Sequence, residues 1–186
     1  SEGNIVLVGA SDHSWLGPSN QAPKNAHGGM RENLFMLKLN PAGGYLWHTF
    51  LGGAVPTEAD GVAIGPSDQI ILIGDSSQNW LGPGNAAPLK THTSDGSLDM
   101  FIVSVNSSGV YSWHTFVGGA GHDWGKAINL RSTSVYIAGD SSSAWNGPGG
   151  QAPIKAYTGG TDILIAKYDT SGAYQWHTYY GSNLSD

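Results

Sequence analysis

The sequence predicts an all-β fold built from three tandem repeats, and three observations lead to that prediction. Charged residues make up only 12% of the chain, and 28 of its 186 residues are glycine. Such a composition is poor in helix formers and rich in turn residues. The segment Trp47-His48-Thr49-Phe50 recurs in closely similar form at residues 113–116 and 176–179. No stretch shows the sustained period of 3.6 residues that an amphipathic helix requires.

The repeat has a period of about 65 residues. Trp15, Trp80 and Trp145 are each 65 residues apart, and the Trp-His-Thr motif recurs at spacings of 66 and 63. The period exceeds the roughly 40–50 residues of WD40 and kelch repeats. Two apolar segments recur with the motifs: Ile5–Gly9 with Ile70–Gly74 and Val135–Gly139, and Leu34–Leu39 with Met100–Val105 and Ile163–Tyr168.

Each repeat is expected to contain four short strands. In the second repeat they are predicted over Gly61–Gly65, Gln69–Asp75, Asp99–Asn106 and Tyr111–Gly118, and the first strand of the third repeat over Gly125–Leu130. The third and fourth strands are joined by turns that begin with Asn or Asp and have glycine at the fourth place. This pattern suits a type I turn followed by a residue with positive φ. These turns fall at residues 40–43, 106–109 and 169–172.

Several predicted strands are continuous apolar runs, which indicates burial on both faces. Four-stranded sheets stacked radially as β-propeller blades meet that requirement, and a β-sandwich is the alternative. We expect a first blade lacking its first strand at residues 1–53, a second at 54–119 and a third at 120–186. A two-residue insertion is expected within Ala54–Ala59, before Asp60-Gly61. Since propellers have roughly four to eight blades, the expected partners are further blades of a longer protein or copies of this chain.

The repeat also resembles a known family, the SBBP β-propeller repeat of bacterial proteins. The likeness covers essentially the whole chain and rests on segments such as Gly118–Ile128, Trp145–Pro148, Gly159–Lys167 and Ser171–Trp176. The first repeat departs from it, with Met30–Asn33 where the third has Gly-Thr-Asp. The resemblance implies a secreted or cell-surface bacterial protein, acting as a non-catalytic structural or adhesive scaffold.

The long loops between the second and third strands are the first candidate ligand site. Each spans about two dozen residues, far more than a hairpin needs. Tryptophans at 15, 80 and 145 could stack on sugar rings while Asn20 and Asn85 bond hydroxyls, giving one carbohydrate site per blade. Alternatively, Trp15, Trp80 and Trp145 are buried and hold the loop down, and the Gly-Pro pair after each fixes its path.

Two further sets of residues could bind a metal ion. His48, His114 and His177 lie on the fourth, outermost strands, so they are not expected to converge and should instead form hydrogen bonds between blades. Asp60 and Asp123 could bind Ca²⁺ with backbone carbonyls, and Ca²⁺ is the one cofactor that the sequence suggests. No Asp-x-Asp-x-Asp-Gly loop is present, so capping of turn amides is favoured.

Composition and motifs exclude several other functions. The chain has no cysteine, and its net charge of −6 with eight Lys plus Arg argues against nucleic-acid binding. No apolar stretch reaches the length that membrane insertion requires. We identify no catalytic residue, since neither His-Glu-x-x-His nor Gly-x-Ser-x-Gly occurs. An enzyme using a central channel would need non-repeating polar residues on the first strands, where Lys126 alone breaks the pattern.

Overall fold

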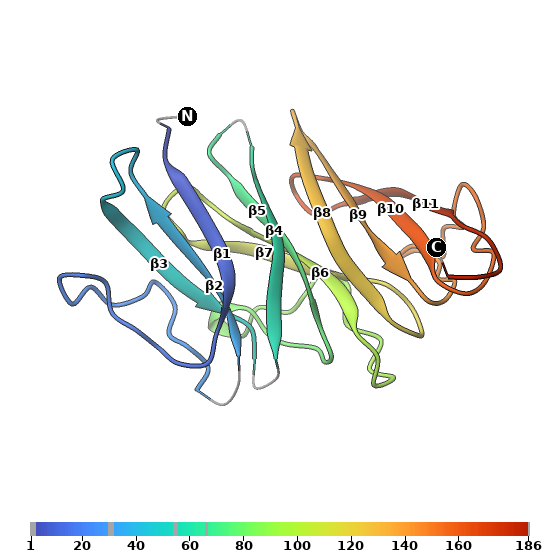
Figure 1. Ribbon diagram of the computed structural model, residues 1–186, viewed down its shortest axis with the longest axis horizontal. Coiled ribbons are helices and arrows are strands. Elements are labelled where there is room, and N and C mark those ends of the chain that lie inside the picture. The colour runs from blue at the N-terminus through green and yellow to red at the C-terminus, as the bar shows by residue number, and fades with distance from the viewer. Residues whose placement is uncertain (1–2, 30–31, 54–55, 66, 186) are drawn as a thin grey trace.

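The protein consists of three antiparallel β-sheets that lie side by side (Figure 1). The computed structural model describes residues 3–29, 32–53, 56–65 and 67–185. Within these residues one short 3₁₀ turn, Pro83–Asn85, lies in the loop between the fifth and sixth strands. The strands are β1 (Ile5–Ser11), β2 (Asn33–Leu39), β3 (Tyr45–Leu51), β4 (Thr57–Ile64), β5 (Ile70–Ser76), β6 (Asp99–Val105), β7 (Tyr111–Val117), β8 (Asp123–Arg131), β9 (Ser134–Ser141), β10 (Asp162–Asp169) and β11 (Tyr174–Tyr180).

Each sheet is a meander of strands that are consecutive in sequence. The first sheet has the order β1-β2-β3, the second β4-β5-β6-β7 and the third β8-β9-β10-β11. The all-β prediction is confirmed, and the predicted second, third and fourth strands of the middle repeat match β5, β6 and β7 to within a residue at each end. The Asx-x-x-Gly turns close the last hairpin of each sheet, with Gly43, Gly109 and Gly172 at φ values of 80°, 78° and 85°.

The first strands begin earlier than predicted, and the expected two-residue insertion is wrong. Thr57 of β4 pairs with Ser76, and Asp123 of β8 pairs with the equivalent Ser141, so Thr57 and Asp123 occupy one position of the repeat. The unpaired residues of two β-bulges, Asp60 and Lys126, likewise occupy one position. Because both strands carry the bulge at the same position, neither repeat has an inserted residue here, and the match of Asp60 to Asp123 followed residue type alone. Residues 54 and 55 of the predicted insertion lie outside the described residues.

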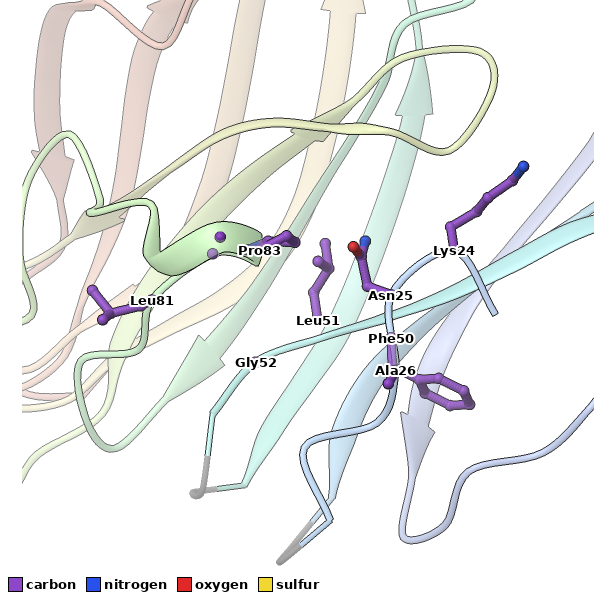
Figure 2. Close-up of a pocket in the computed structure, with 10 residues that line it drawn as sticks. Lys24, Asn25, Ala26, Phe50, Leu51, Gly52, Leu81 and Pro83 are labelled. Carbon is purple, nitrogen blue, oxygen red and sulfur yellow. The ribbon is translucent and has the colours of Figure 1, made fainter. Parts of the chain in front are cut away.

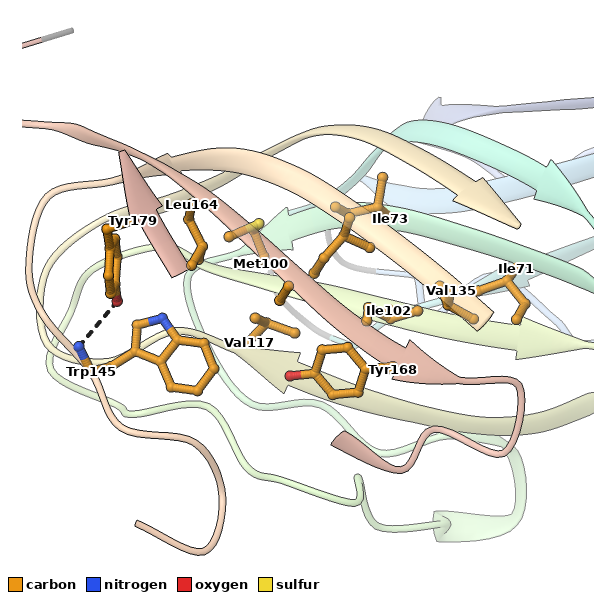
Figure 3. Packing of buried hydrophobic residues seen from close by; sticks show 12 residues of the cluster. Ile71, Ile73, Met100, Ile102, Val117, Val135, Trp145, Leu164, Tyr168 and Tyr179 are labelled. Carbon is orange, nitrogen blue, oxygen red and sulfur yellow. Dashed lines mark hydrogen bonds between the residues drawn. The ribbon is translucent and has the colours of Figure 1, made fainter. Parts of the chain in front are cut away.

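The sheets contact one another through their first strands. Strand β4 contacts β1 and β2 of the first sheet, and β8 contacts β5 and β6 of the second in the same way. Figure 1 shows β1, β4 and β8 side by side. Each interface contains a buried apolar cluster, and Figure 3 shows the one between the second and third sheets. The third sheet therefore packs on the second in the same way as the second packs on the first.

The middle sheet confirms that apolar runs signal burial on both faces. In β5, Ile70 and Leu72 belong to the cluster facing the first sheet, while Ile71 and Ile73 belong to the cluster facing the third. All four side chains are at most 1% exposed. A strand between two packed neighbours needs no polar face, so alternation disappears.

The outer faces of the first and third sheets remain uncovered among the described residues. Ile5 and Leu7 occupy the positions of Ile70 and Leu72 but are 43% and 44% exposed. On the third sheet, Ile163 and Tyr180 are 42% and 51% exposed, whereas their equivalents in the middle sheet, Met100 and Val117, are fully buried. Both ends of the three-sheet array thus present apolar surface that its centre buries.

Candidate functional site

Each long loop is fastened to its own sheet by a tryptophan, a histidine and a tyrosine. In the middle repeat the Trp80 indole stacks on the His114 ring, with centroids 3.8 Å apart and planes 8° apart. His114 Nε2 is 3.1 Å from the Trp80 carbonyl oxygen, and Nδ1 is 2.7 Å from the Tyr111 hydroxyl. A carbonyl only accepts, so Nε2 carries the proton and Nδ1 accepts from the tyrosine. The same unit recurs in Trp15, His48 and Tyr45 and in Trp145, His177 and Tyr174.

Burial favours the neutral form of two of these histidines, His114 and His177. It lowers the pKa of His114 to about 4, and it also lowers the pKa of His177. The prediction that the histidines form hydrogen bonds is confirmed, but the predicted location between blades is wrong. Each histidine bonds within its own repeat, because the long loop folds back over the fourth strand of the same sheet.

The Trp-x-Gly-Pro motif is one half of this contact and Tyr-x-Trp-His is the other. Trp80 and Trp145 are 3% and 5% exposed, and one face of each ring is covered by histidine. Gly82 lies against the Tyr111 ring, since a Cβ atom there would be 2.5 Å from the tyrosine Cζ. This geometry supports the packing interpretation of Trp80 and Trp145, whose rings are poorly placed to stack on a sugar. Trp15 stacks on His48 in the same way but is only partly buried.

Asn20 and Asn85 are exposed residues at the tip of the same loops. Their φ values are 61° and 62°, and the third repeat has Gly150 at this position with φ 81°. Asparagine and glycine are the residues that adopt a left-handed backbone most readily. Their interchange indicates a role in turning the backbone rather than in binding.

The loop does line a cleft, through its Gly-Pro segment rather than its tryptophan. Two hollows of about 380 and 400 Å³ lie between the first and second sheets and share Lys24, Asn25, Pro83 and Gly84. Figure 2 shows the residues that line the first of them. One continues toward residues 50–52 at the end of β3, the other toward the β6–β7 turn at residues 109–111. The Asn25 amide points between Leu51 and Lys24, so the cleft combines amide, ammonium and apolar groups.

Two residues of this cleft, Lys24 and Asn25, are replaced by other residue types in the next interface, although the Gly-Pro segment recurs there. The backbone N–H groups of Lys24 and Leu89 donate to equivalent histidine carbonyls, both at 2.9 Å, so Leu89 takes the place of Lys24. Lys90 then takes the place of Asn25, and its Nζ donates to the Gly118 carbonyl at 2.8 Å. The Asn25 amide instead donates to Thr49 Oγ1 at 2.9 Å. The sequence holds a signal of this difference, since lysine follows Ala22-Pro23 directly, whereas one residue separates Ala87-Pro88 from its lysine.

A charged cluster on the first strands was also missed. Strand β4 carries Glu58 and Asp60, and Lys126 of β8 lies 3.9 Å from Asp140. Burial, together with repulsion from Asp60 and Glu58, raises the pKa of Asp75 to about 6. The cluster escaped prediction because β4 was expected to begin at Gly61. It offers carboxylates and an ammonium group for contact with a polar ligand, but no feature selects a reaction.

Asp123 caps a turn, as predicted, and Asp60 does not. Asp123 Oδ2 accepts a hydrogen bond from the Gly119 N–H at 3.1 Å, and burial raises its pKa to about 7. Asp60 lies in the β4 bulge instead. Within residues 3–29, 32–53, 56–65 and 67–185, no group of three or more His, Asp or Glu is placed to hold a metal ion.

No protein-family model matches the chain, and a search of curated proteins finds no match. The SBBP resemblance therefore stays a prediction. Across the part of the chain that the structure describes, no helix has the length and apolar character to cross a membrane.

Proposed function

We propose that this chain forms successive blades of a β-propeller and acts as a non-catalytic structural or adhesive scaffold. One observation carries the proposal: the tryptophan, histidine and tyrosine residues that recur in every repeat pack and form hydrogen bonds within the protein, where they hold loops to strands and sheets to one another. In the middle repeat, for example, Trp80, Tyr111 and His114 fasten the loop, and Trp113 contacts the next sheet. The assignment to the bacterial cell surface or exterior rests on the resemblance of the repeat alone.

The open edge of β1 supports a radial arrangement with a further strand. In the complete sheets a glycine lies directly beside the bulged first strand: a Cβ on Gly74 would be 1.9 Å from the Glu58 carbonyl oxygen, and one on Gly139 would be 2.0 Å from that of Trp124. Strand β1 has Gly9 at this position, with only Phe35 ring atoms nearby. In two sheets this glycine makes room for the neighbouring first strand. The same glycine recurs in β1, although the described residues include no first strand beside β1.

This architecture can be tested by supplying the first strand. Fusing a copy of residues 119–133, which contain β8 and its turn, directly before Asn4 would place a bulged strand beside β1. Pairing the open edge should stabilise the protein by about 2–3 kcal/mol, which raises the melting temperature by roughly 5–10 °C. Differential scanning calorimetry measures the change. The control is the same fusion with Ile128→Pro in the copied strand, and equal melting temperatures for both fusions would count against the propeller arrangement.

Carbohydrate binding is the second candidate, and the cleft between the first two sheets favours it. Lys24, Asn25 and the Gly82–Gly84 segment provide polar groups beside apolar surface, the combination that small-ligand sites use. This would be one site in the chain rather than one per blade. The observation concerns the Gly-Pro segment of the loop, not the stacked tryptophans.

A glycan array separates the two candidates. The scaffold proposal predicts no specific binding by the wild-type chain. Carbohydrate binding in the cleft predicts a specific signal that falls at least about tenfold in Lys24→Ala, the loss of one charged hydrogen bond. Asn85→Gly is the matched variant, since Gly150 shows that the turn accepts glycine. Loss of binding in that variant alone would instead support the loop-tip site.

A further inference from the structure

Two side chains of the first sheet hold one carbonyl group of the second. Lys38 Nζ and Trp47 Nε1 both donate to the carbonyl oxygen of Ser107, at 2.9 and 3.2 Å. Ser107 is the second residue of the turn that joins β6 to β7. The Trp47 indole covers Gly109 of the same turn, where a Cβ atom would be 2.8 Å from the ring. We call Lys38 and Trp47 the donor fork of the first sheet.

The same turn position is held at the next interface. Trp113 Nε1 of the second sheet donates to the Thr170 carbonyl oxygen at 3.2 Å, and its indole covers Gly172. Serine replaces the lysine in this sheet, and Gln69 Nε2 supplies the second hydrogen bond to Thr170 at 2.9 Å. Each interface therefore places two donors on one turn carbonyl and an indole on the turn glycine.

The third sheet carries a donor fork with nothing bound to it. Lys167 of β10 pairs in register with Trp176 of β11, as Lys38 pairs with Trp47. Neither Nζ of Lys167 nor Nε1 of Trp176 has a hydrogen-bond partner within the described residues, and Lys167 lies 5.6 Å from the Tyr136 ring centroid. The exposed Ile163 and Tyr180 belong to the same face by strand alternation.

The first sheet presents a matching turn at the opposite end of the molecule. In the turn from Asn40 to Gly44, Asn40 Oδ1 accepts hydrogen bonds from the N–H groups of Ala42 and Gly44 at 3.0 and 2.8 Å. Asn106 Oδ1 accepts equivalent bonds in the turn that Trp47 covers. Gly43 has φ 80°, and no atom lies within 4 Å of the place where its Cβ would be. The turn therefore has open space at Gly43 in which an indole ring could pack.

We propose that Lys167 and Trp176 of one copy of this chain bind the Asn40–Gly44 turn of a second copy. Their donors would bond the Pro41 carbonyl, with the indole over Gly43. The Ile163 and Tyr180 face would then meet the Ile5 and Leu7 face, as the equivalent residues meet inside the chain. Both halves of the contact belong to one chain, so copies add head to tail through a heterologous interface. The inference rests on the proposed scaffold function and names its partner.

Two chains with opposite ends blocked test the contact. Trp176→Glu removes the indole of the donor fork and places a carboxylate there, but it keeps the turn. Gly43→Asn keeps a left-handed backbone, which asparagine tolerates, and its Cβ fills the open space in which the indole would pack. Analytical ultracentrifugation should show association of the wild type at micromolar concentration and a monomer of 19.4 kDa for each variant. An equimolar mixture should form a heterodimer and nothing larger, because only one pair of complementary ends remains.

Melting curves of each variant, matching the wild type within a few degrees, confirm that a monomer is folded. The dimer constant of the mixture should weaken at least tenfold when Lys167→Ala is added to the Gly43→Asn chain. A wild type that stays monomeric overturns the proposal, and so does an associating wild type whose blocked variants still self-associate or fail to pair. Stabilisation by the fused first strand reports on one chain alone, so it separates failure of this contact from failure of the scaffold proposal.

Discussion

Replacing Gly139 with alanine is expected to destabilise the protein by about 4 kcal/mol or more, enough to leave a fold of ordinary stability marginal. The new Cβ would be 2.0 Å from the Trp124 carbonyl oxygen, a backbone atom of the bulged strand β8. Because that strand is fixed by its pairing with β9 and its contacts with the second sheet, it cannot move away cheaply. Gly74→Ala should behave alike, since its Cβ would be 1.9 Å from the Glu58 carbonyl oxygen.

Gly9→Ala is the matched control within the same chain. Gly9 occupies the equivalent position of β1, but the nearest atom to its Cβ would be Cε1 of Phe35 at 2.9 Å, at the far end of a side chain on the partly open face. The Phe35 ring can turn aside, so the cost should stay below about 1 kcal/mol. Urea unfolding followed by circular dichroism measures all three variants. Similar losses for Gly9→Ala and Gly139→Ala would show that the strand itself requires the glycine, not a neighbouring bulged strand.

The third strands and the first strands of the sheets differed in how well the sequence predicted them. Strand β6 was expected at Asp99–Asn106 and lies at Asp99–Val105. It could be found because all seven of its residues are buried between two sheets and the Asn106 turn follows directly. Burial on both faces leaves an apolar run in the sequence, as it also does in β5.

The first strands were located by the sequence, but their starting residues were not, for a physical reason. Strand β4 carries Glu58 and Asp60, and β8 carries Lys126, so both contain exposed charged residues that interrupt any apolar pattern. Each also contains a bulge, which breaks the period of two on which strand recognition depends. Matching Asp60 to Asp123 was reasonable by residue type and wrong by position.

The contact that holds each long loop to its sheet, formed by a tryptophan, a histidine and a tyrosine, appears in the sequence only as two separate motifs. Trp80 and His114 are 34 residues apart, and no local pattern states that their rings touch. One signal was available: where the first two repeats have asparagine, at 20 and 85, the third has glycine, which points to a backbone role. The residue after Ala-Pro, lysine in the first repeat and leucine in the second, can be read from the sequence. That Lys24 lines a cleft could not be predicted, because the cleft depends on how two sheets pack.

His114→Ala is expected to lose about 3–5 kcal/mol, the second large effect. The substitution removes a ring stacked 3.8 Å from Trp80 and leaves a cavity beneath the long loop. It also leaves the Trp80 carbonyl and the Tyr111 hydroxyl without their histidine partner. His114→Phe keeps an aromatic ring but removes both hydrogen bonds, so the difference between the two variants separates stacking from bonding. Urea unfolding at pH 7.5 gives both values.

The pH dependence of the stability difference between the wild type and His114→Phe tests whether the buried His114 ring is neutral. Burial lowers the pKa of His114 from 6.5 to about 4, so between these values the unfolded chain binds the proton that the folded protein refuses. The contribution of His114 is therefore present above pH 6.5 and falls by about 3 kcal/mol as the pH drops to 4.

Asp123, whose pKa burial raises to about 7, acts in the opposite direction, but it is common to wild type and His114→Phe and cancels in their difference. The stability advantage of the wild type over His114→Phe should thus shrink on acidification. A difference that stays constant from pH 7.5 to 4 would mean that His114 is not held neutral by its burial, and the contact that holds the long loop to its sheet would need another explanation.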